Sequence, residues 1–343
     1  MRLSFFVFLN MYHIFMKYKN IIVTGGRGFI MFNGLKLWKS IYPECNFICI
    51  DNNTYADKFM QKEKNNWLDT NNILRFVIDL SNDNAYYQLC DIVEKYNIDA
   101  IIHGAAESHV DNSLNDPNMF FKSNVLGTAN ILNVAKKYNL RITIVSTDEV
   151  YGETTPNDWL LLDDNELPRI NPSSPYSSSK ASADLIAKSY FRTFGTKVSI
   201  SRCSNNFGPF QHPEKLIPTV INKVLNNEKI PVYGSGNQKR HWIYVDEHNK
   251  SIMNILEKGH PGFIYNIAPL HDNYLTNIDL IKFIIDKLGK SYDLIEHIQD
   301  RAGHDVSYYM EANYDFCNSN RHWQDDMIKT IDFYSTFKGN YEK

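Results

Sequence analysis

The chain has 343 residues, of which 43% are hydrophobic and 22% are charged, and its formal net charge at pH 7 is -3. This length fits one large domain with a smaller lobe, and the composition is ordinary for a soluble globular protein. The nearly balanced charge gives no reason to expect nucleic acid as a partner. The five cysteines are odd in number and lack the spacing of metal ligands. We therefore expect no metal site, and reduced thiols in a cytoplasmic protein.

The first 17 residues form an apolar extension that stands apart from the rest of the chain. Residues 3–16 are too short to span a bilayer, and Asn10 and His13 interrupt them. No small-residue cleavage site follows, which argues against a signal peptide. We interpret this extension as a floppy or misassigned leader, with Met11 or Met16 as the true start; an interfacial anchor is the alternative. No other stretch resembles a membrane segment, so we expect no membrane partner.

Short apolar runs alternate with longer helical patterns through the first 200 residues, which predicts a parallel sheet with crossover helices. Strands are expected at 21–24, 47–50, 74–78, 100–103, 142–146 and 197–201, and the main helices at 116–138 and 175–194. After residue 203, short strands at 230–233, 242–245 and 263–267 mix with helices near 214–227 and 276–289. We expect a Rossmann-like, doubly wound α/β domain with a smaller mixed α/β lobe on its C-terminal side. The NAD-binding domain is assigned to 18–202 with returns near 237–265, and the substrate-binding lobe to 203–236 and 266–337.

The first strand runs into a glycine-rich turn, Ile21-Ile-Val-Thr-Gly-Gly-Arg-Gly-Phe-Ile30, and then into a helical pattern. Backbone N–H groups in such a turn can approach a pyrophosphate together with the helix N-terminus. Asp51 ends the second strand, where a carboxylate holds both hydroxyls of an adenosine ribose and repels a 2′-phosphate. This context predicts a site for NAD rather than NADP, with Asp51 as a simple turn residue as the alternative. Asp79 closes the third strand, and the small Ala105 and Ala106 after the fourth leave room for a dinucleotide.

Two pairs of residues indicate the chemistry. Tyr176 and Lys180 stand four apart on a predicted helix and share a face, so the ammonium should lower the pKa of the phenol and make it a base. Asp148 and Glu149 follow the fifth strand and supply a second acid/base couple, which oxidation does not need and loss of water does. If Asp148 is to donate a proton at neutral pH, burial or the charge on Glu149 must raise its pKa. One alternative is that the Tyr-Lys pair lies on a surface helix by chance. The other is that Asp148 and Glu149 lie in a solvated loop.

Longer strings resemble one family. They are Ala105-Ala-Glu-Ser-His-Val-Asp111, Ser146-Thr-Asp-Glu-Val-Tyr-Gly152, Tyr176-Ser-Ser-Ser-Lys-Ala-Ser182, Arg202-Cys-Ser-Asn-Asn-Phe-Gly-Pro209, Pro213-Glu-Lys-Leu-Ile-Pro218 and Asp300-Arg-Ala-Gly-His-Asp305. After residue 18 the chain resembles the nucleotide-sugar 4,6-dehydratases of the extended short-chain dehydrogenase superfamily, and most of all the branch that acts on dTDP-glucose. The resemblance implies an NAD-dependent hydro-lyase that oxidises C4 of a nucleoside-diphosphate-glucose, eliminates water across C5 and C6, and returns the hydride to C6. The 4-keto-6-deoxy product would feed the synthesis of a deoxysugar such as rhamnose.

The resemblance also implies roles for individual residues. Tyr176 would deprotonate the C4 hydroxyl, Thr147 would orient it, and Lys180 would bond the nicotinamide ribose. Glu149 would remove the C5 proton and Asp148 would protonate the departing C6 hydroxyl. The implied cofactor-binding residues are Gly25, Gly28, Phe29, Ile30, Asp51, Asn52, Thr54, Asp79, Leu80, Ala105, Ala106, Ser123, Tyr176, Lys180 and Asn206.

The implied substrate-binding residues are Ser108, Thr147, Asn205, Lys215, Leu216, Pro231, Val232, Tyr233, Arg240, Asn277, Arg301 and His304. Arg240 and Arg301 would clamp the diphosphate, because guanidinium groups match phosphate oxygens, and residues 231–233 would line the nucleobase. A helix cap is an equal alternative for Asn277. The aromatic residues Trp242, Tyr244 and Trp323 are expected in the core.

Two positions depart from the family pattern. Met31 stands where a third glycine normally permits close packing of helix and strand. Met31 either pushes the helix away, or the contact between helix and strand repacks around it. We expect repacking. Val306 and Ser307 lie where the family is often basic, which would loosen contact with the diphosphate or base.

Several questions stay open at this level. A nucleotide-sugar 4-epimerase or decarboxylase on the same scaffold is one alternative, GDP-mannose dehydration is a closer one, and a non-catalytic nucleotide-sugar-binding protein is another. The sequence does not decide between dTDP-glucose and UDP-glucose. Family resemblance implies a homodimer paired through the helices at 116–138 and 175–194.

Overall fold

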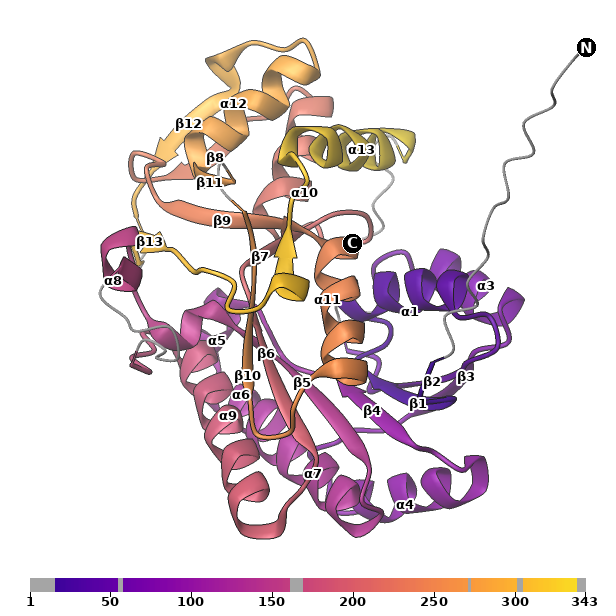
Figure 1. Cartoon of the computed structure of the whole chain (residues 1–343). Coiled ribbons are helices and arrows are strands. Elements are labelled where there is room, and N and C mark those ends of the chain that lie inside the picture. Colours follow the sequence, from indigo (N-terminus) through magenta and orange to yellow (C-terminus); the bar gives the residue numbers. More distant parts are fainter. Residues whose placement is uncertain (1–15, 55–57, 161–168, 271–272, 301–304, 338–343) are drawn as a thin grey trace, which may run out of the picture.

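The computed structural model describes residues 16–54, 58–160, 169–270, 273–300 and 305–337 (Figure 1). Its base is a sheet of eight strands in the order β14-β10-β6-β5-β4-β1-β2-β3, in which every neighbouring pair is parallel. The strands are β1 (Asn20–Thr24), β2 (Asn46–Asp51), β3 (Leu74–Val77), β4 (Ala100–His103), β5 (Arg141–Thr147), β6 (Val198–Cys203), β10 (Ile264–Pro269) and β14 (Asn318–Ser319). The order reverses between β1 and β4, so a crevice opens at the carboxyl ends of these two strands. This is the doubly wound α/β architecture that the sequence predicts.

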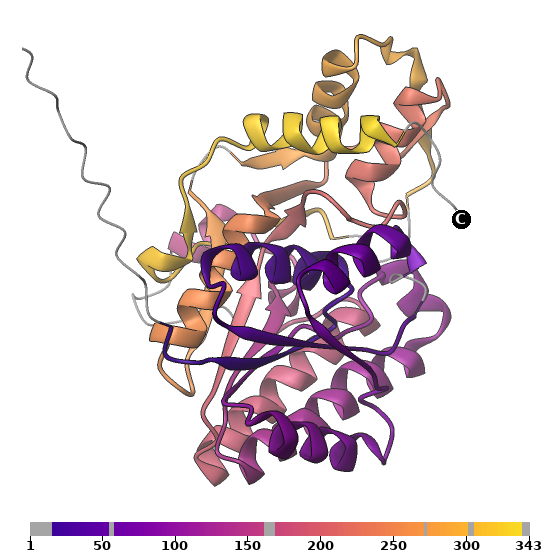
Figure 2. The same ribbon diagram turned by 90° about the vertical axis from the view of Figure 1, so that its right-hand side faces the viewer.

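Helices cover both faces of the sheet, and Figure 2 shows the two layers on either side of the strands. Alternate residues of one strand enter different cores: Ile21 and Val23 pack in one cluster and Ile22 in the other. The first layer contains α1 (Phe29–Ile41) and α11 (Val245–Lys258), and the second contains α4 (Ala85–Tyr96), α7 (Gly127–Lys137) and α9 (Pro175–Phe194). Because both faces are covered, central strands such as β4 and β5 are buried along their whole length.

A smaller lobe lies over the carboxyl ends of the strands (Figure 1). Its strands are β7 (Asn205–Phe207), β9 (Lys239–Tyr244), β11 (Tyr274–Thr276) and β13 (Ser307–Tyr308) in one sheet, and β8 (Ile230–Tyr233) with β12 (Ile295–Ile298) in another. The helices α10 (Leu216–Leu225), α12 (Asn277–Lys287) and α13 (Trp323–Thr336) enclose a separate hydrophobic core. The remaining elements are α3 (Gln61–Thr70), α5 (Val110–Asn115), α6 (Pro117–Phe120), α8 (Pro156–Leu160), the π-helix η1 (Phe121–Leu126) and the 3₁₀ turns η2 (Asp148–Tyr151), η3 (Tyr292–Leu294) and η4 (Asp315–Cys317).

The structure departs from the predicted elements in several places, and the short lobe strands β7, β11, β12 and β13 were not predicted. The strand expected at 242–245 runs from Lys239 to Tyr244 and belongs to the lobe, because Val245 begins α11. The strand expected at 197–201 begins at Val198 and ends at Cys203. The helix expected at 116–138 contains the π-helical stretch η1. The short β14 was not predicted; it lies within the stretch assigned to the lobe, yet it pairs with β10 in the main sheet.

Among the described residues, no helix combines the length and apolar character that crossing a bilayer requires. The extension expected at 1–17 lies outside the described residues, except for its last two, Met16 and Lys17.

Candidate functional site

The glycine turn between β1 and α1 forms one wall of a pocket. Gly25 has a φ of +68°, and a Cβ added there would lie 2.7 Å from Ala105 Cα, so only glycine fits. Gly28 is the N-cap of α1 and contributes no side-chain hydrogen bond, which leaves the first N–H groups of the helix to an anionic ligand. The turn therefore has the form that a pyrophosphate requires.

Most of the predicted cofactor residues meet at this pocket. Asp51 accepts hydrogen bonds from the backbone N–H groups of Arg27 (3.0 Å) and Asn53 (3.1 Å), so its carboxylate supports the turn as well as facing the pocket. Asn206 instead lines a second pocket. The other predicted cofactor residues line neither pocket; they are Phe29, Ile30, Tyr176 and Lys180. The predicted lining residues are Gly25, Gly28, Asp51, Asn52, Thr54, Asp79, Leu80, Ala105, Ala106 and Ser123; those missed are Ile50, Ile78, Ser81, Gly104 and Glu107.

Met31 is accommodated by a glycine on another element. Its side chain is 2% exposed, and a Cβ at Gly104 would lie 2.4 Å from Met31 Cγ and 2.6 Å from its Sδ. The methionine thus occupies the space that a larger residue at 104 would fill. The contact between α1 and the sheet has repacked, as expected.

The acidic pair follows β5 directly. Asp148 is 4% exposed; its Oδ1 accepts a hydrogen bond from Thr147 Oγ1 (3.1 Å), and its Oδ2 has no partner among the described residues. Burial, and after it the charge of Glu149, raises the pKa of Asp148 to about 7. Asp148 therefore has the raised pKa that a proton donor at neutral pH requires. Glu149 lines the second pocket.

A buried network fixes the turn η2 that carries these acids. The hydroxyl of Tyr151 donates to Asn266 Oδ1 (2.8 Å), and its ring lies 4.6 Å from the guanidinium carbon of Arg202. Arg202 Nε in turn donates to Asp184 Oδ2 (2.9 Å) on α9. The turn is thereby tied to β10, β6 and α9.

Tyr176 and Lys180 lie on α9, as predicted, but the expected effect of the ammonium on the phenol is absent. Burial, and after it the charge of Glu149, raises the pKa of Tyr176 well above its ordinary value. Lys180 Nζ donates to the carbonyl oxygen of Val145 (2.7 Å), and burial lowers the pKa of Lys180. The prediction of a lowered phenol pKa is wrong for the chain by itself, because burial and the charge of Glu149 outweigh the hydrogen bond with Thr147, which favours the phenolate.

The second pocket, a cavity of ≈350 Å³, lies where the lobe meets the main domain. All the predicted substrate residues with described positions line it except Thr147, which is buried beside Asp148. Arg301 and His304 lie outside the described residues. The predicted lining residues are Ser108, Asn205, Lys215, Leu216, Pro231, Val232, Tyr233, Arg240 and Asn277.

Two of these residues are held in place before any ligand binds. The Arg240 guanidinium donates to the carbonyl oxygen of Asp305 (2.8 Å), and its carbon lies 4.2 Å from the Tyr308 ring centroid. Lys215 Nζ donates to the carbonyl oxygen of Ser108 (2.9 Å). Both cations are thus oriented at the pocket, which suits a diphosphate.

Asn277 does not cap α12. The cap is Thr276, whose Oγ1 accepts from the N–H of Asp279 (3.1 Å). Asn277 Oδ1 is buried, lines the pocket and has no hydrogen-bond partner within the described chain, so it is available to a ligand donor.

The aromatic residues Trp242 and Trp323 pack in the core of the lobe as expected, with Tyr244 partly buried beside them. Trp242 has a further role, because it also lines the pocket and its Nε1 has no acceptor in the described part of the chain. Glu214 and Gln238 line the pocket as well and were missed. Glu214 stands inside a string that carries the family resemblance, which was the signal available for it.

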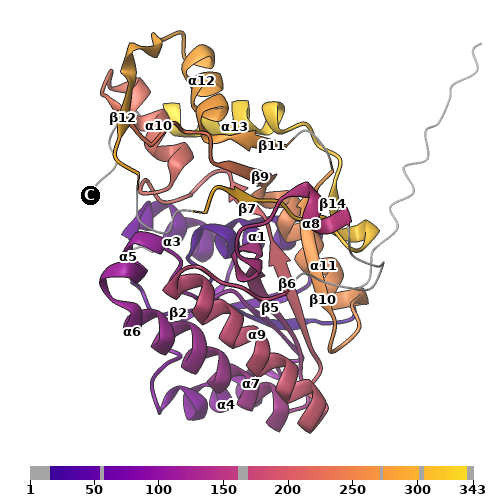
Figure 3. The ribbon, with the colours of Figure 1, turned by 90° about the vertical axis from the view of Figure 1, so that its left-hand side faces the viewer.

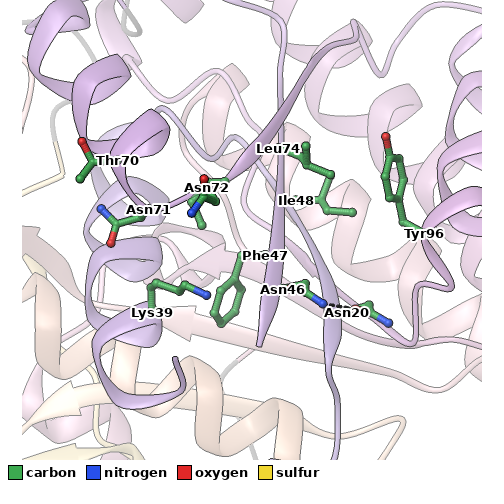
Figure 4. A pocket seen from close by; sticks show the side chains of 11 residues that line it. Asn20, Lys39, Asn46, Phe47, Ile48, Thr70, Asn71, Asn72, Leu74 and Tyr96 are labelled. Carbon is green, nitrogen blue, oxygen red and sulfur yellow. Dashed lines mark hydrogen bonds between the residues drawn. The ribbon is translucent and has the colours of Figure 1, made fainter. Parts of the chain in front are cut away.

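A third pocket, drawn in Figure 4, lies beside β2 and β3, away from the acidic pair. Its polar groups mostly bind one another or nearby backbone: Asn46 Nδ2 donates to Asn20 Oδ1 (2.8 Å), Asn71 Nδ2 to the Trp67 carbonyl (2.8 Å) and Lys39 Nζ to the Pro43 carbonyl (2.6 Å). It offers no acid/base pair. Within the described ranges, no three His, Cys, Asp or Glu residues are grouped to hold a metal ion.

A family model and several known proteins match this chain. Residues 21–268 match the family described as the NAD dependent epimerase/dehydratase family. The chain is 36% identical over 320 residues to the dTDP-glucose 4,6-dehydratase of Mycobacterium tuberculosis (strain ATCC 25618 / H37Rv), covering 92% of each protein. It is 38% identical over 293 residues to that of Mycolicibacterium smegmatis, covering 85% of each.

Solved structures of similar proteins agree with the chain over most of its length. DesIV, a dTDP-glucose 4,6-dehydratase from Streptomyces venezuelae with NAD and TYD bound, has a TM-score of 0.85 and 34% identity, covering 94% of this chain and 99% of that one. The dTDP-glucose 4,6-dehydratase of Bacillus anthracis in complex with NAD has a TM-score of 0.83 and 33% identity, covering 94% and 98%.

Proposed function

Because the chain belongs to the NAD dependent epimerase/dehydratase family, we propose that it is a hydro-lyase that converts a nucleoside-diphosphate-glucose to its 4-keto-6-deoxy sugar. The observation that carries the proposal is the buried carboxyl of Asp148, with a pKa of about 7, next to Glu149 at the substrate pocket. An oxidation or a 4-epimerisation needs no second acid/base pair, whereas elimination of water needs both a base and an acid.

The cofactor of this reaction is NAD, and the first pocket fits it. The glycines at 25 and 28 leave space for a pyrophosphate, and Asp51 favours an unphosphorylated ribose. When bound, NAD accepts a hydride from the sugar and later returns it. We propose that the cofactor binds to the domain expected at 18–202 and the nucleotide sugar to the lobe, to which β9 (Lys239–Tyr244) also belongs although 237–265 was expected in the cofactor domain.

The chain's own groups provide the proton transfers at C4. Tyr176 takes the proton of the C4 hydroxyl, and Thr147 orients that oxygen. A phenol with a raised pKa needs a cation close to it before it ionises at neutral pH. Lys180, buried one helical turn away, is the side chain placed to supply it once it leaves the Val145 carbonyl.

The acidic pair provides the elimination. Glu149 removes the C5 proton, a C5–C6 double bond forms, and the C6–O bond breaks as Asp148 donates its proton to the departing hydroxyl. Both residues then hold the opposite protonation state from the one in which they started. General acid–base assistance of this kind contributes roughly 10²–10⁴-fold per step.

The lobe binds the nucleotide. Arg240 and Lys215 face the diphosphate, residues 231–233 line the base, and Ser108, Asn205, Leu216 and Asn277 complete the wall. We retain Arg301 and His304 as substrate residues on the family resemblance alone. The choice between dTDP and UDP, which differ by a base methyl and a ribose hydroxyl, is left to the experiment below.

We propose that the enzyme is a cytoplasmic homodimer. Cys45, Cys90, Cys203 and Cys317 are free thiols, as in a reducing compartment. In Figure 3, α9 and α7 run along the outer face of the sheet. This layer exposes large apolar side chains, which a second copy of the same face would bury as a four-helix bundle. They are Phe121 and Leu126 on η1 and Leu185, Phe191 and Phe194 on α9.

The test is turnover of dTDP-glucose and UDP-glucose in parallel, with added NAD, read as the alkali-induced ultraviolet absorbance of a 4-keto sugar. We expect a signal with one of them, and the larger kcat/KM identifies the nucleotide. Absence of a signal with both sugars would overturn the dehydratase assignment in favour of a binding protein.

Glu149→Gln tests the base. The variant should bind NAD as the wild type does but lose about 10²-fold or more in dehydration and in entry of solvent hydrogen at C5. Glu63→Gln, at an exposed position on α3, is the matched control and should keep full activity. Normal solvent hydrogen entry at C5 in Glu149→Gln would show that another group is the base.

A further inference from the structure

A chain of buried side-chain hydrogen bonds runs beneath the cofactor pocket and has no part in the chemistry proposed above. It begins at Thr24, where β1 ends, passes through His103 at the end of β4, and reaches Thr128 on α7 and Asn124 on η1. None of these four residues is more than 1% exposed. Polar groups buried so deeply are costly unless they are paired.

Every hydrogen bond in this chain has a defined direction. Thr128 Oγ1 donates its one proton to the Asn124 carbonyl (2.6 Å), so in its 3.0 Å contact with His103 Nε2 the imidazole is the donor. Burial lowers the pKa of His103 to about 3, so the ring is neutral and Nδ1 accepts from Thr24 Oγ1 (2.7 Å). The Thr24 oxygen accepts from the N–H of Ala105 (3.2 Å). One tautomer of the imidazole satisfies all partners.

The chain continues through Asn124 to the helix that carries Tyr176. Asn124 Oδ1 accepts from the N–H of Glu107 (2.8 Å), and its Nδ2 donates to the Glu107 carbonyl (2.9 Å) and to Ser179 Oγ (2.8 Å). Ser179 Oγ donates to the Tyr176 carbonyl (2.6 Å). The segment Gly104–Glu107 is therefore held at both ends: at Ala105 by Thr24 and at Glu107 by Asn124.

We propose that His103 and Thr128 are positioning residues that fix the segment Gly104–Glu107 as a wall of the NAD pocket and couple it to α9. The inference rests on the proposed function in taking NAD as the ligand. All four residues of the segment line that pocket, and the Gly25 turn leaves no room for movement, since an added Cβ would already lie 2.7 Å from Ala105 Cα. A displacement of the segment would therefore change the contacts of a bound ligand directly.

Thr128→Val is the decisive variant, because it exchanges a hydroxyl for a methyl at nearly constant volume. It leaves His103 Nε2–H without its acceptor and removes the side-chain hydrogen bond to the Asn124 carbonyl. We expect the Kd for NAD, measured by calorimetry, to rise about tenfold or more, while the Kd for dTDP at the lobe pocket stays within about twofold. Thr128→Ser restores the hydroxyl and should restore NAD affinity. Thr24→Val breaks the chain at its other end and replaces Thr128→Val should that variant not fold.

Thr143→Val is the matched control. Thr143 lies on β5 opposite Ile102 of β4, fully buried, and its hydroxyl has no hydrogen-bond partner in the described chain. This change should leave NAD affinity as it is. Equal NAD affinities in Thr128→Val and Thr143→Val, or a fall in Tm in Thr128→Val without a change in the Kd for NAD, would overturn the proposal. A wild type that binds NAD but dehydrates neither sugar would refute the proposed function alone, and these Kd values would still decide the role of His103 and Thr128.

Discussion

At the scale of single residues, the site depends on environments that set the protonation of neighbouring groups differently. Asp148 and Glu149 are adjacent in sequence, yet the fold buries the first and turns the second toward the pocket. Desolvation therefore acts mainly on Asp148, and the charge of Glu149 adds to it. The same two causes raise the pKa of Tyr176. Asp148, at the end of β5, is thus kept protonated. Tyr176 needs a nearby cation before its phenol can lose a proton.

The raised pKa of Asp148 predicts a specific pH dependence of stability. Between its ordinary pKa of 3.8 and its folded pKa of about 7, the folded state holds a proton that the unfolded state has released. Stability therefore falls as pH rises through this window and levels off above pH 7. Asp148→Asn cannot lose a proton, so its Tm should exceed that of the wild type by an amount that grows from pH 5 to pH 8. A rise of the Asp148 pKa from 3.8 to about 7 corresponds to roughly 4 kcal/mol.

Thermal unfolding of the two proteins across this pH range makes the comparison. Asp91→Asn, at an exposed position on α4, is the control and should follow the wild type. Parallel curves for Asp148→Asn and the wild type would mean that Asp148 titrates near its ordinary pKa and is not the acid.

At the scale of elements, the sequence predicted what local pattern decides. Buried strands such as β4 and β5 stand out as apolar runs, and α9 was predicted with its observed bounds. In the structure Ser174 caps this helix and Gly195 ends it. Features that depend on tertiary contact were not predictable. The π-helix at η1 has no marker in its composition, and β14 has two residues and exists only because β10 lies beside it. The electrostatics of Tyr176 also depend on burial, which a Tyr-Lys spacing does not report.

Met31 shows how a departure from a motif can be compensated far along the chain. The sequence raised the question of how a methionine fits where a glycine is usual, but the answer lies at Gly104, on a different strand end. A large side chain at position 31 thus packs against a position, 104, that has no side chain. Size complementarity of this kind is invisible until the fold brings both residues together.

This contact predicts non-additive effects on stability. Gly104→Ala places a Cβ 2.4 Å from Met31 Cγ, and overpacking of this kind costs about 1–3 kcal/mol. Met31→Ala leaves a cavity and costs about 2–5 kcal/mol. In the double variant the new Cβ stands in the vacated space, so its cost should be smaller than the sum by about 0.5–3 kcal/mol. Urea unfolding of the four proteins measures the coupling, and a coupling near zero would show that the two side chains do not compete for the same space.

At the scale of the whole molecule, the main domain and the lobe contribute different residues to the two pockets. The main domain contains the glycine turn, the acidic pair and α9. The lobe places Arg240, Tyr233 and Asn277 over the carboxyl ends of the strands. Residues far apart in sequence, such as Ser108 and Asn277, therefore line one cavity. The helical layer that includes α7 and α9 is left with an outer face that the described chain does not cover.

That outer face predicts the oligomeric state. Leu126 and Leu185 are 51% and 55% exposed, and a carboxylate placed at either position would be buried without a partner in a helix-to-helix interface, which is strongly unfavourable. Leu126→Glu and Leu185→Glu should each shift the protein from dimer to monomer in sedimentation equilibrium at micromolar concentration. Val77→Glu introduces the same charge at a side chain that is 64% exposed on the edge strand β3, and it should stay dimeric. Monomeric wild type, or variants on η1 and α9 that dimerise as well as Val77→Glu, would rule out this face as the interface.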